Sequence, residues 1–255
     1  MSQRVVQLTD LHLQANADDL YKGIHADGHF LQCLAWLAKQ DYDLLLLTGD
    51  LAHGATPKTY ARLHAYLDQL DKPWCWLPGN HDEPQYMLAV SAQAVDQVRV
   101  VEMAAWRLLL VDSTQAADGC GAGSISDAGL QQLREHLSAS FLPTVLVMHH
   151  NPIPVNSAWQ DKIMLANAHE LQQVVTGQHH VKAVVFGHIH QTLDCHVNGI
   201  RYLGAPATSV QFKAQQQGFT LQPEYGPGLR VIDLGSDGRL LTDIVRLPKK
   251  EWVDA

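Results

Sequence analysis

The sequence is poor in cysteine and has no long apolar stretch, and each absence excludes a class of protein. Its four cysteines, Cys33, Cys75, Cys120 and Cys195, lie far apart, without the close pairs of zinc ribbons or redox motifs. We therefore expect reduced thiols in a cytoplasmic protein. No apolar stretch has the length of a signal peptide or a membrane span, so we expect a soluble protein without a membrane partner.

Basic residues are too few and too scattered to attract a polyanion. The formal net charge is −8 and no run of lysine or arginine occurs, so extended nucleic acid is not an expected partner. Hydrophobic residues make up 46% of the 255 residues, which is enough for a sizeable core. We expect one domain over residues 1–255 rather than two small ones.

Apolar runs and turn signals alternate through the first two thirds of the chain, which is typical of an α/β protein. Strands are predicted at 4–9, 44–48, 74–77, 98–102, 106–112, 144–148 and 181–186, and helices at 30–40, 57–70, 126–138 and 168–177. The last third favours two hairpins, at 192–203 and 229–247. Between them, 204–228 is predicted to be a long irregular loop, and such loops are often functional.

Polar motifs rich in metal-binding side chains follow the predicted strands. They are Asp10-Leu11-His12, Gly49-Asp50, Gly79-Asn80-His81-Asp82, His149 and Gly187-His188-Ile189-His190. Ligands of open α/β sheets collect at the carboxyl ends of strands, which is where these motifs fall. Together they offer two carboxylates, one carboxamide and four imidazoles, a set that suits two divalent cations with a shared ligand. The sequence therefore predicts a phosphoester hydrolase.

The spacing within two motifs has a geometric meaning. Side chains two residues apart on a strand point to the same face. We therefore expect Asp10 and His12 to reach one cation from a single extended segment. His188 and His190 have the same spacing, and the same prediction holds for them.

Each of these residues has an ordinary explanation when taken alone. Gly49-Asp50 fits a turn after a buried strand, and Asn80 and Asp82 are common turn residues. The joint pattern in this order is what favours a site. Of the adjacent pair His149-His150 only one side chain should ligate, and we favour His149 because His150 begins a turn with Asn151-Pro152.

The order of these motifs over residues 10–190 resembles that of the calcineurin-like metallophosphoesterases. The resemblance implies an α/β fold, a four-layer αββα sandwich of two mixed sheets with outer helices. It also implies two cations bridged by Asp50, with a hydroxide in the other bridging position. The implied ligands are Asp10, His12, Asp50 and His190 for one cation, and Asp50, Asn80, His149 and His188 for the other.

Side chains next to the implied metal ligands are candidates for proton transfer and substrate binding. A leaving alkoxide needs a proton, and His81 is the candidate acid, with Asp82 orienting its ring. Substrate contacts are expected from Asn80, His81 and His12. Iron or manganese is the expected metal, and a nitrogen and oxygen ligand set without thiolate also suits zinc or cobalt.

Three further stretches, 79–84, 167–171 and 204–213, resemble the bacterial 3′,5′-cyclic AMP phosphodiesterases of this superfamily. This closer resemblance implies a cyclic nucleotide as substrate and hydrolysis of cyclic AMP to 5′-AMP, with the 3′ oxygen leaving. Segment 21–26 also resembles the family's early loop, but His25 and Ala26 stand where Asn and Thr are expected. We therefore assign no base contacts to that loop.

Two other functions stay open, as does the formation of a homodimer. A family member that hydrolyses another nucleotide or a phospholipid precursor, as a phosphodiesterase or a phosphatase, would have the same metal centre. A non-catalytic metal-binding scaffold of this fold would usually have lost ligands, and none is missing here.

The other histidines and the tryptophans are predicted to cap, pack or face solvent. His53, three residues after Asp50, is the main exception among the histidines. Trp159 lies in a polar, irregular stretch after His149, where packing is favoured over the alternative of lining a substrate pocket. The histidines expected at the surface or at caps are His25, His29, His64, His136, His169, His179, His180 and His196.

Overall fold

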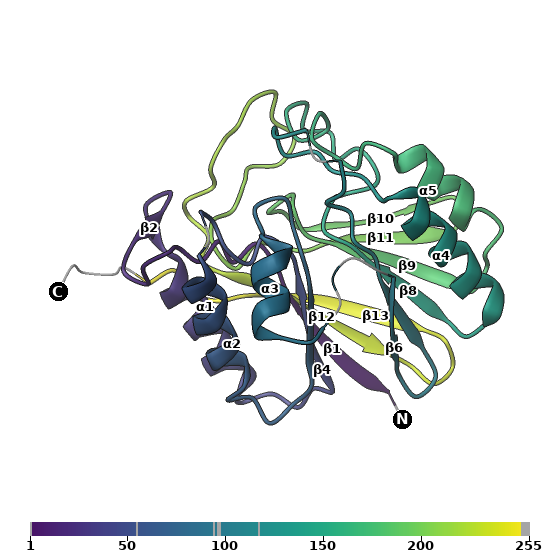
Figure 1. Cartoon of the computed structure of the whole chain (residues 1–255), viewed down its shortest axis with the longest axis horizontal. Helices are drawn as coiled ribbons and strands as arrows, with labels where there is room; N and C mark the ends of the chain where they lie inside the picture. The colour runs from purple at the N-terminus through teal and green to yellow at the C-terminus, as the bar shows by residue number, and fades with distance from the viewer. Residues whose placement is uncertain (1, 55, 94, 96–97, 117, 251–255) are drawn as a thin grey trace.

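Two large β-sheets pack face to face, and helices cover the outer side of each sheet (Figure 1). This arrangement comes from a computed structural model, which describes residues 2–250 except 55, 94, 96–97 and 117. The predicted four-layer sandwich is confirmed.

The first sheet has five strands in the order β13-β12-β1-β4-β5. Strands β1, β4 and β5 are parallel, whereas β12 runs antiparallel to both β1 and β13. Because the three parallel strands end at the same edge, the loops after them lie side by side. The strands are β1 (Gln3–Leu8), β4 (Leu44–Thr48), β5 (Trp74–Leu77), β12 (Gly228–Leu234) and β13 (Leu240–Arg246).

The second sheet has six strands in the order β10-β11-β9-β8-β7-β6. Its four central strands are parallel, and the two edge strands are antiparallel to their neighbours. The strands are β6 (Arg99–Glu102), β7 (Arg107–Leu110), β8 (Thr144–Val147), β9 (Val181–Phe186), β10 (Leu193–Val197) and β11 (Ile200–Gly204). A separate short hairpin joins β2 (Leu20–Tyr21) to β3 (Ile24–His25).

Three apolar clusters hold these layers together. The cluster between the two sheets includes Val5, Leu46 and Val185, all of which are buried. The other two lie between each sheet and its helices. The helices are α1 (Ala26–Leu37), α2 (Pro57–Leu67) and α3 (Pro84–Val90) against the first sheet, and α4 (Asp127–Ala139) and α5 (Ala168–Val175) against the second. Strand β4 is apolar along its length because it is covered on both faces.

Most predicted elements are confirmed within two residues of their ends, and three strands match at both ends. Helix α1 begins four residues before the prediction, because the His25 side chain caps it by accepting a hydrogen bond from Gly28 N. Helix α3 was not predicted, since its seven residues are too few for a helical period to stand out. No helix among the described residues is both long and apolar enough to cross a membrane.

Candidate metal centre

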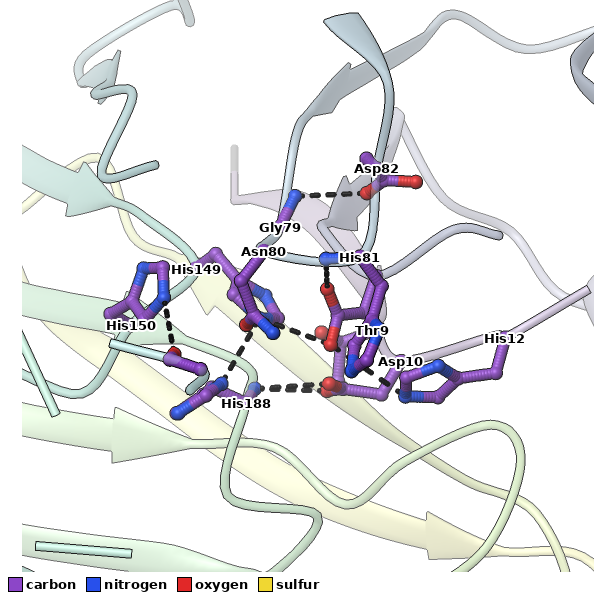
Figure 2. Close-up of polar contacts among 12 residues, drawn as sticks. Thr9, Asp10, His12, Gly79, Asn80, His81, Asp82, His149, His150 and His188 are labelled. Carbon is purple, nitrogen blue, oxygen red and sulfur yellow. Dashed lines mark hydrogen bonds and ion pairs between the residues drawn. The ribbon is translucent and has the colours of Figure 1, made fainter. Parts of the chain in front are cut away.

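The seven predicted metal ligands meet where five strands end. Figure 2 labels five of them, namely Asp10, His12, Asn80, His149 and His188. Six of the seven ligands are buried, and Asn80 is partly buried. The ligands are Asp10 and His12 after β1, Asp50 after β4, Asn80 after β5, His149 after β8, and His188 and His190 after β9. The loops of both sheets therefore contribute to one centre, as predicted from the positions of the motifs.

The backbone that carries these ligands is not extended, contrary to the prediction. Strand β1 ends at Leu8, and Asp10 and His12 have φ angles of 52° and 49°. His188 and His190 have φ angles of 67° and 50°. A left-handed conformation costs a non-glycine residue about 1–2 kcal/mol, and such strain is concentrated at functional sites. Each pair still converges, because two left-handed residues curl the segment around the centre.

One group of ligand atoms forms around His190. Asp10 Oδ1 lies 3.2 Å from His190 Nε2, and His12 Nε2 lies 3.2 Å from the same nitrogen. His12 Nε2 is also 3.6 Å from Asp50 Oδ2. These four residues are the set implied for the first cation.

A second group of ligand atoms forms around His149 Nε2. Asp50 Oδ2 lies 3.4 Å from this nitrogen, Asn80 Oδ1 lies 3.2 Å away and His188 Nδ1 lies 3.3 Å away. One nitrogen cannot hydrogen-bond three groups at once, but three groups and the nitrogen can surround a cation. Asp50 Oδ2 therefore belongs to both groups of atoms.

Backbone carbonyl groups orient the histidine rings for metal binding. His149 Nδ1 lies 2.8 Å from Thr48 O, and His188 Nε2 lies 3.0 Å from Ile163 O. Each of these nitrogens must donate its proton to the carbonyl, so His149 Nε2 and His188 Nδ1 are the nitrogens that face each other. At 3.3 Å their lone pairs repel unless a proton or a cation lies between them. The residues present therefore fit a pair of divalent cations.

His150 does not take part in this geometry, although it is buried next to His149. Its Nδ1 lies 2.9 Å from Ser113 Oγ and its Nε2 lies 3.1 Å from Gly121 O, so both ring nitrogens have protein partners. The structure thus brings His149 rather than His150 to Asp50, as the sequence favoured.

Burial and charge set the protonation of the ligands before any cation binds. Burial lowers the pKa of His12 and of His188 well below 6.5, so both rings are neutral and ready to ligate. Burial also opposes charging of His149, but the carboxylate of Asp50 outweighs it and raises the pKa of His149 to about 9. The Asp50–His149 ion pair therefore holds a proton that a bound cation would replace.

Asp82 holds two loops together and does not contact the His81 ring, contrary to its predicted orienting role. Its carboxylate accepts hydrogen bonds from the backbone N–H groups of Gly79, Leu51 and Ala52 and from the Tyr60 hydroxyl. Figure 2 shows this carboxylate turned away from the cluster of histidines. Asp82 thereby ties the loop after β5 to the loop after β4.

His81 stands at the open side of the centre. Its backbone N–H donates to Asp50 Oδ1 at 2.9 Å, which fixes the turn that carries the ring. The ring is exposed, and its centroid lies 5.1 Å from the centroid of His12 and 4.5 Å from that of His53. His53, the exception expected among the other histidines, therefore does lie beside the predicted site.

A cavity of about 180 Å³ opens over the metal centre. Trp159 lines this cavity and also packs against the first core cluster, so its packing role is confirmed and its contact with substrate stays a prediction. Further residues of the lining were not predicted individually from the sequence. Two of them lie in the long loop 204–228, for which a functional role was predicted. The further lining residues are Tyr21, Lys22, Cys120, Gly121, Ile163, Phe212 and Phe219.

Two aromatic rings pack flat against ligand histidines. The Tyr21 ring stacks on His12 with a centroid distance of 4.3 Å, and the Phe212 ring stacks on His190 at 3.9 Å. Flat contacts of this kind limit the rotation of an imidazole. The sequence offers no local signal for them, because each pair joins residues of different loops or strands that meet only in the folded protein.

The loops approach each other so closely that two of the motif glycines cannot be replaced without movement. Gly49 has a φ of +88°, and a Cβ there would lie 2.5 Å from His149 Nδ1. A Cβ on Gly79 would overlap the backbone nitrogen and Oδ1 of Asp50. The glycines in these motifs therefore allow the ligands to converge.

Known structures share this fold at low sequence identity. A dimetal phosphatase from Danio rerio superposes with a TM-score of 0.68 at 13% identity, covering 94% of this chain and 98% of that one. GAP50, the anchor in the inner membrane complex of Plasmodium, superposes with a TM-score of 0.61 at 11% identity, covering 98% of this chain and 90% of that one. At such identities the likeness shows the fold alone.

Sequence comparison gives closer relatives. A 3′,5′-cyclic-nucleotide phosphodiesterase of Nostoc sp. is 36% identical, over 96% of this chain and 92% of its own. The 3′,5′-cyclic adenosine monophosphate phosphodiesterase CpdA of Escherichia coli K12 is 35% identical, over 96% of this chain and 90% of its own. A family model described as calcineurin-like phosphoesterase matches residues 3–192. The predicted resemblance is confirmed, and the chain belongs to the calcineurin-like phosphoesterase family.

Proposed function

We propose that this protein hydrolyses 3′,5′-cyclic AMP to 5′-AMP at a two-metal centre. The observation that carries the proposal is the shared position of Asp50 Oδ2, which is 3.6 Å from His12 Nε2 and 3.4 Å from His149 Nε2. The choice of substrate rests on relatives named as cyclic nucleotide phosphodiesterases, which are 33–36% identical over 96–98% of this chain.

The ligand residues divide between the two cations as the two groups of atoms do. Asp10, His12 and His190 would hold one cation, Asn80, His149 and His188 would hold the other, and Asp50 would bind both. Bound cations neutralise phosphoryl charge and lower the pKa of water. Iron or manganese is the metal we propose, since oxygen and nitrogen ligands without thiolate suit them.

His81 is the acid we propose for the leaving 3′ oxygen. An alkoxide is a poor leaving group, so a donor near the phosphorus speeds its departure. Three observations support His81: its ring is exposed, it lines the cavity, and its backbone is tied to Asp50. His12 and Asn80 also line the cavity, which supports their predicted contact with substrate.

The complete ligand set weighs against a scaffold without activity. All seven donors are present and converge, and five of the ten described non-glycine residues with a left-handed backbone belong to this set. A protein-binding surface would need neither the strain nor the burial of these polar groups.

The test compares substrates that differ in the base or in the phosphoester. Purified protein with manganese or iron is incubated with cyclic AMP, cyclic GMP, a linear diester and a monoester, and products are separated by chromatography. We expect 5′-AMP from cyclic AMP. The absence of cyclic AMP turnover, or 3′-AMP as the product, would contradict the proposal.

A leaving-group comparison tests the role of His81. His81→Ala should slow cyclic AMP hydrolysis by ~10²–10⁴-fold, because the alkoxide leaves without a proton donor. It should slow bis(p-nitrophenyl) phosphate far less, because p-nitrophenolate needs no proton to leave. Metal content should stay unchanged, and the exposed His169→Ala serves as control. Loss of metal, or equal slowing of both substrates, would contradict this role.

A further inference from the structure

Three aromatic side chains form a group at the outer end of the cavity. Phe219 lies on the loop between β11 and β12, and its ring meets the rings of Trp159 and Phe212 edge to face, with centroids 5.3 Å and 5.1 Å away. Trp159 and Phe212 also meet, at 5.3 Å. We call Phe219, Trp159 and Phe212 the aromatic platform. All three line the cavity over the metal centre.

The aromatic platform is continuous with the metal centre. Phe212 stacks flat on the ligand His190, with centroids 3.9 Å apart and planes 12° apart, and Phe219 is the next ring beyond it. A ligand whose phosphate lies at the metal centre therefore has an aromatic surface nearby, separated from the ligand His190 by the Phe212 ring. The base of a nucleotide is also separated from its phosphate, by one ribose.

Phe219 is the accessible member of the aromatic platform. Phe212 is 7% exposed, whereas Phe219 is 50% exposed despite its apolar ring. The Lys22 ammonium lies 4.7 Å from the Phe219 ring centroid and holds the ring from the opposite loop. Among the described residues that line this cavity, Lys22 is the single lysine or arginine, and its charge complements a phosphate anion.

Most polar groups of the cavity lie at or beside the metal centre. Asp50, Asn80 and the ligand histidines line that end with His53 and His81, whereas the end formed by the aromatic platform is apolar apart from Lys22. Such a surface recognises a base by the area of its ring rather than by hydrogen bonds to its edge. Stacking on an aromatic ring tolerates any base, and purines offer the larger area.

We propose that Phe219, backed by Trp159 and Phe212, is the stacking surface for the base of the cyclic nucleotide. This inference rests on the proposed function, because it assigns the base end of the same substrate. It follows that cyclic AMP and cyclic GMP bind with similar strength, and that a cyclic pyrimidine nucleotide binds more weakly.

The test uses Phe219→Ala with two matched substrates, cyclic AMP and a base-free ribose 3′,5′-cyclic phosphate. We expect kcat/KM for cyclic AMP to fall by about 5- to 150-fold, the range for loss of one base stack. Turnover of the base-free substrate should stay within twofold, which also shows that the fold and Lys22 are intact. Phe219→Trp should restore cyclic AMP turnover.

Phe141 offers a matched control for the Phe219 variant. Phe141→Ala removes an aromatic ring that is 80% exposed and lies outside the cavity, and it should change neither substrate. Equal loss for both substrates, or no loss for cyclic AMP, would overturn the stacking surface alone. If the unaltered protein hydrolyses other diesters but neither cyclic substrate, the proposed function itself fails.

Discussion

Asp82→Asn separates the loop-holding role of Asp82 from a role in orienting His81. The carboxylate of Asp82 accepts hydrogen bonds from four groups, three of them backbone N–H groups of the loops after β4 and β5. Asparagine has nearly the same shape but only one acceptor oxygen. Whichever way the amide turns, its NH2 group faces at least one buried N–H or O–H donor of these loops.

The loss of stability can be worked out from these contacts. If the amide oxygen stays near the Tyr60 hydroxyl, the Gly79 N–H loses its acceptor, which lay at 2.8 Å. An unsatisfied buried donor costs about 1–3 kcal/mol. We therefore expect Asp82→Asn to lower the free energy of unfolding by about 1–3 kcal/mol. Tyr60→Phe, which removes one donor to Asp82, should lower it by about 1–2 kcal/mol.

The assay is urea unfolding at pH 8.5 with saturating metal, followed by turnover measured well below the unfolding midpoint. Burial and the charge of Asp50 raise the pKa of Asp82 to about 7, so the carboxylate is ionised at this pH. We expect turnover per bound metal pair to stay within about threefold of the unaltered protein. Unchanged stability together with a ~100-fold loss of turnover would refute the reasoning and restore the orienting role.

Three further predictions concern the ligands and their support. Asp50→Ala should lose both cations and His12→Ala only one, as measured by metal analysis of the dialysed proteins; equal loss would argue against bridging. Gly79→Ala should abolish turnover because its Cβ displaces Asp50, whereas Gly218→Ala, with open space around it, should have no effect. In metal-free protein the pKa of His149 is raised from 6.5 to about 9 by Asp50, so this ion pair stabilises the fold below pH 6.5 and the stabilisation is lost as the pH rises through 9. Urea unfolding in chelator should show the free energy of unfolding falling across this window, by an amount on the order of 3 kcal/mol, and a flat profile would contradict the pair.

The sequence alone was sufficient for most of the elements and for the set of candidate ligands that converge in the fold. Strand β4 was predicted with both of its ends, because an apolar run bounded by polar turns is a local signal. The seven ligands were predicted because each follows such a strand and the chemistry of their side chains is specific. Helix α3 was missed because seven residues carry too weak a period.

Only the tertiary structure decided how those residues work together. The left-handed backbone at Asp10 and His188 is imposed by contacts with other loops and not by local propensity, so an extended segment was wrongly predicted. Asp82 proved to bind the loop after β4, about 30 residues earlier in the chain. The stacking of Phe212 on His190 joins the loop after β9 to the long loop. Periodicity reports which face of an element is buried, whereas the partner of a side chain depends on segments that meet only in the folded protein.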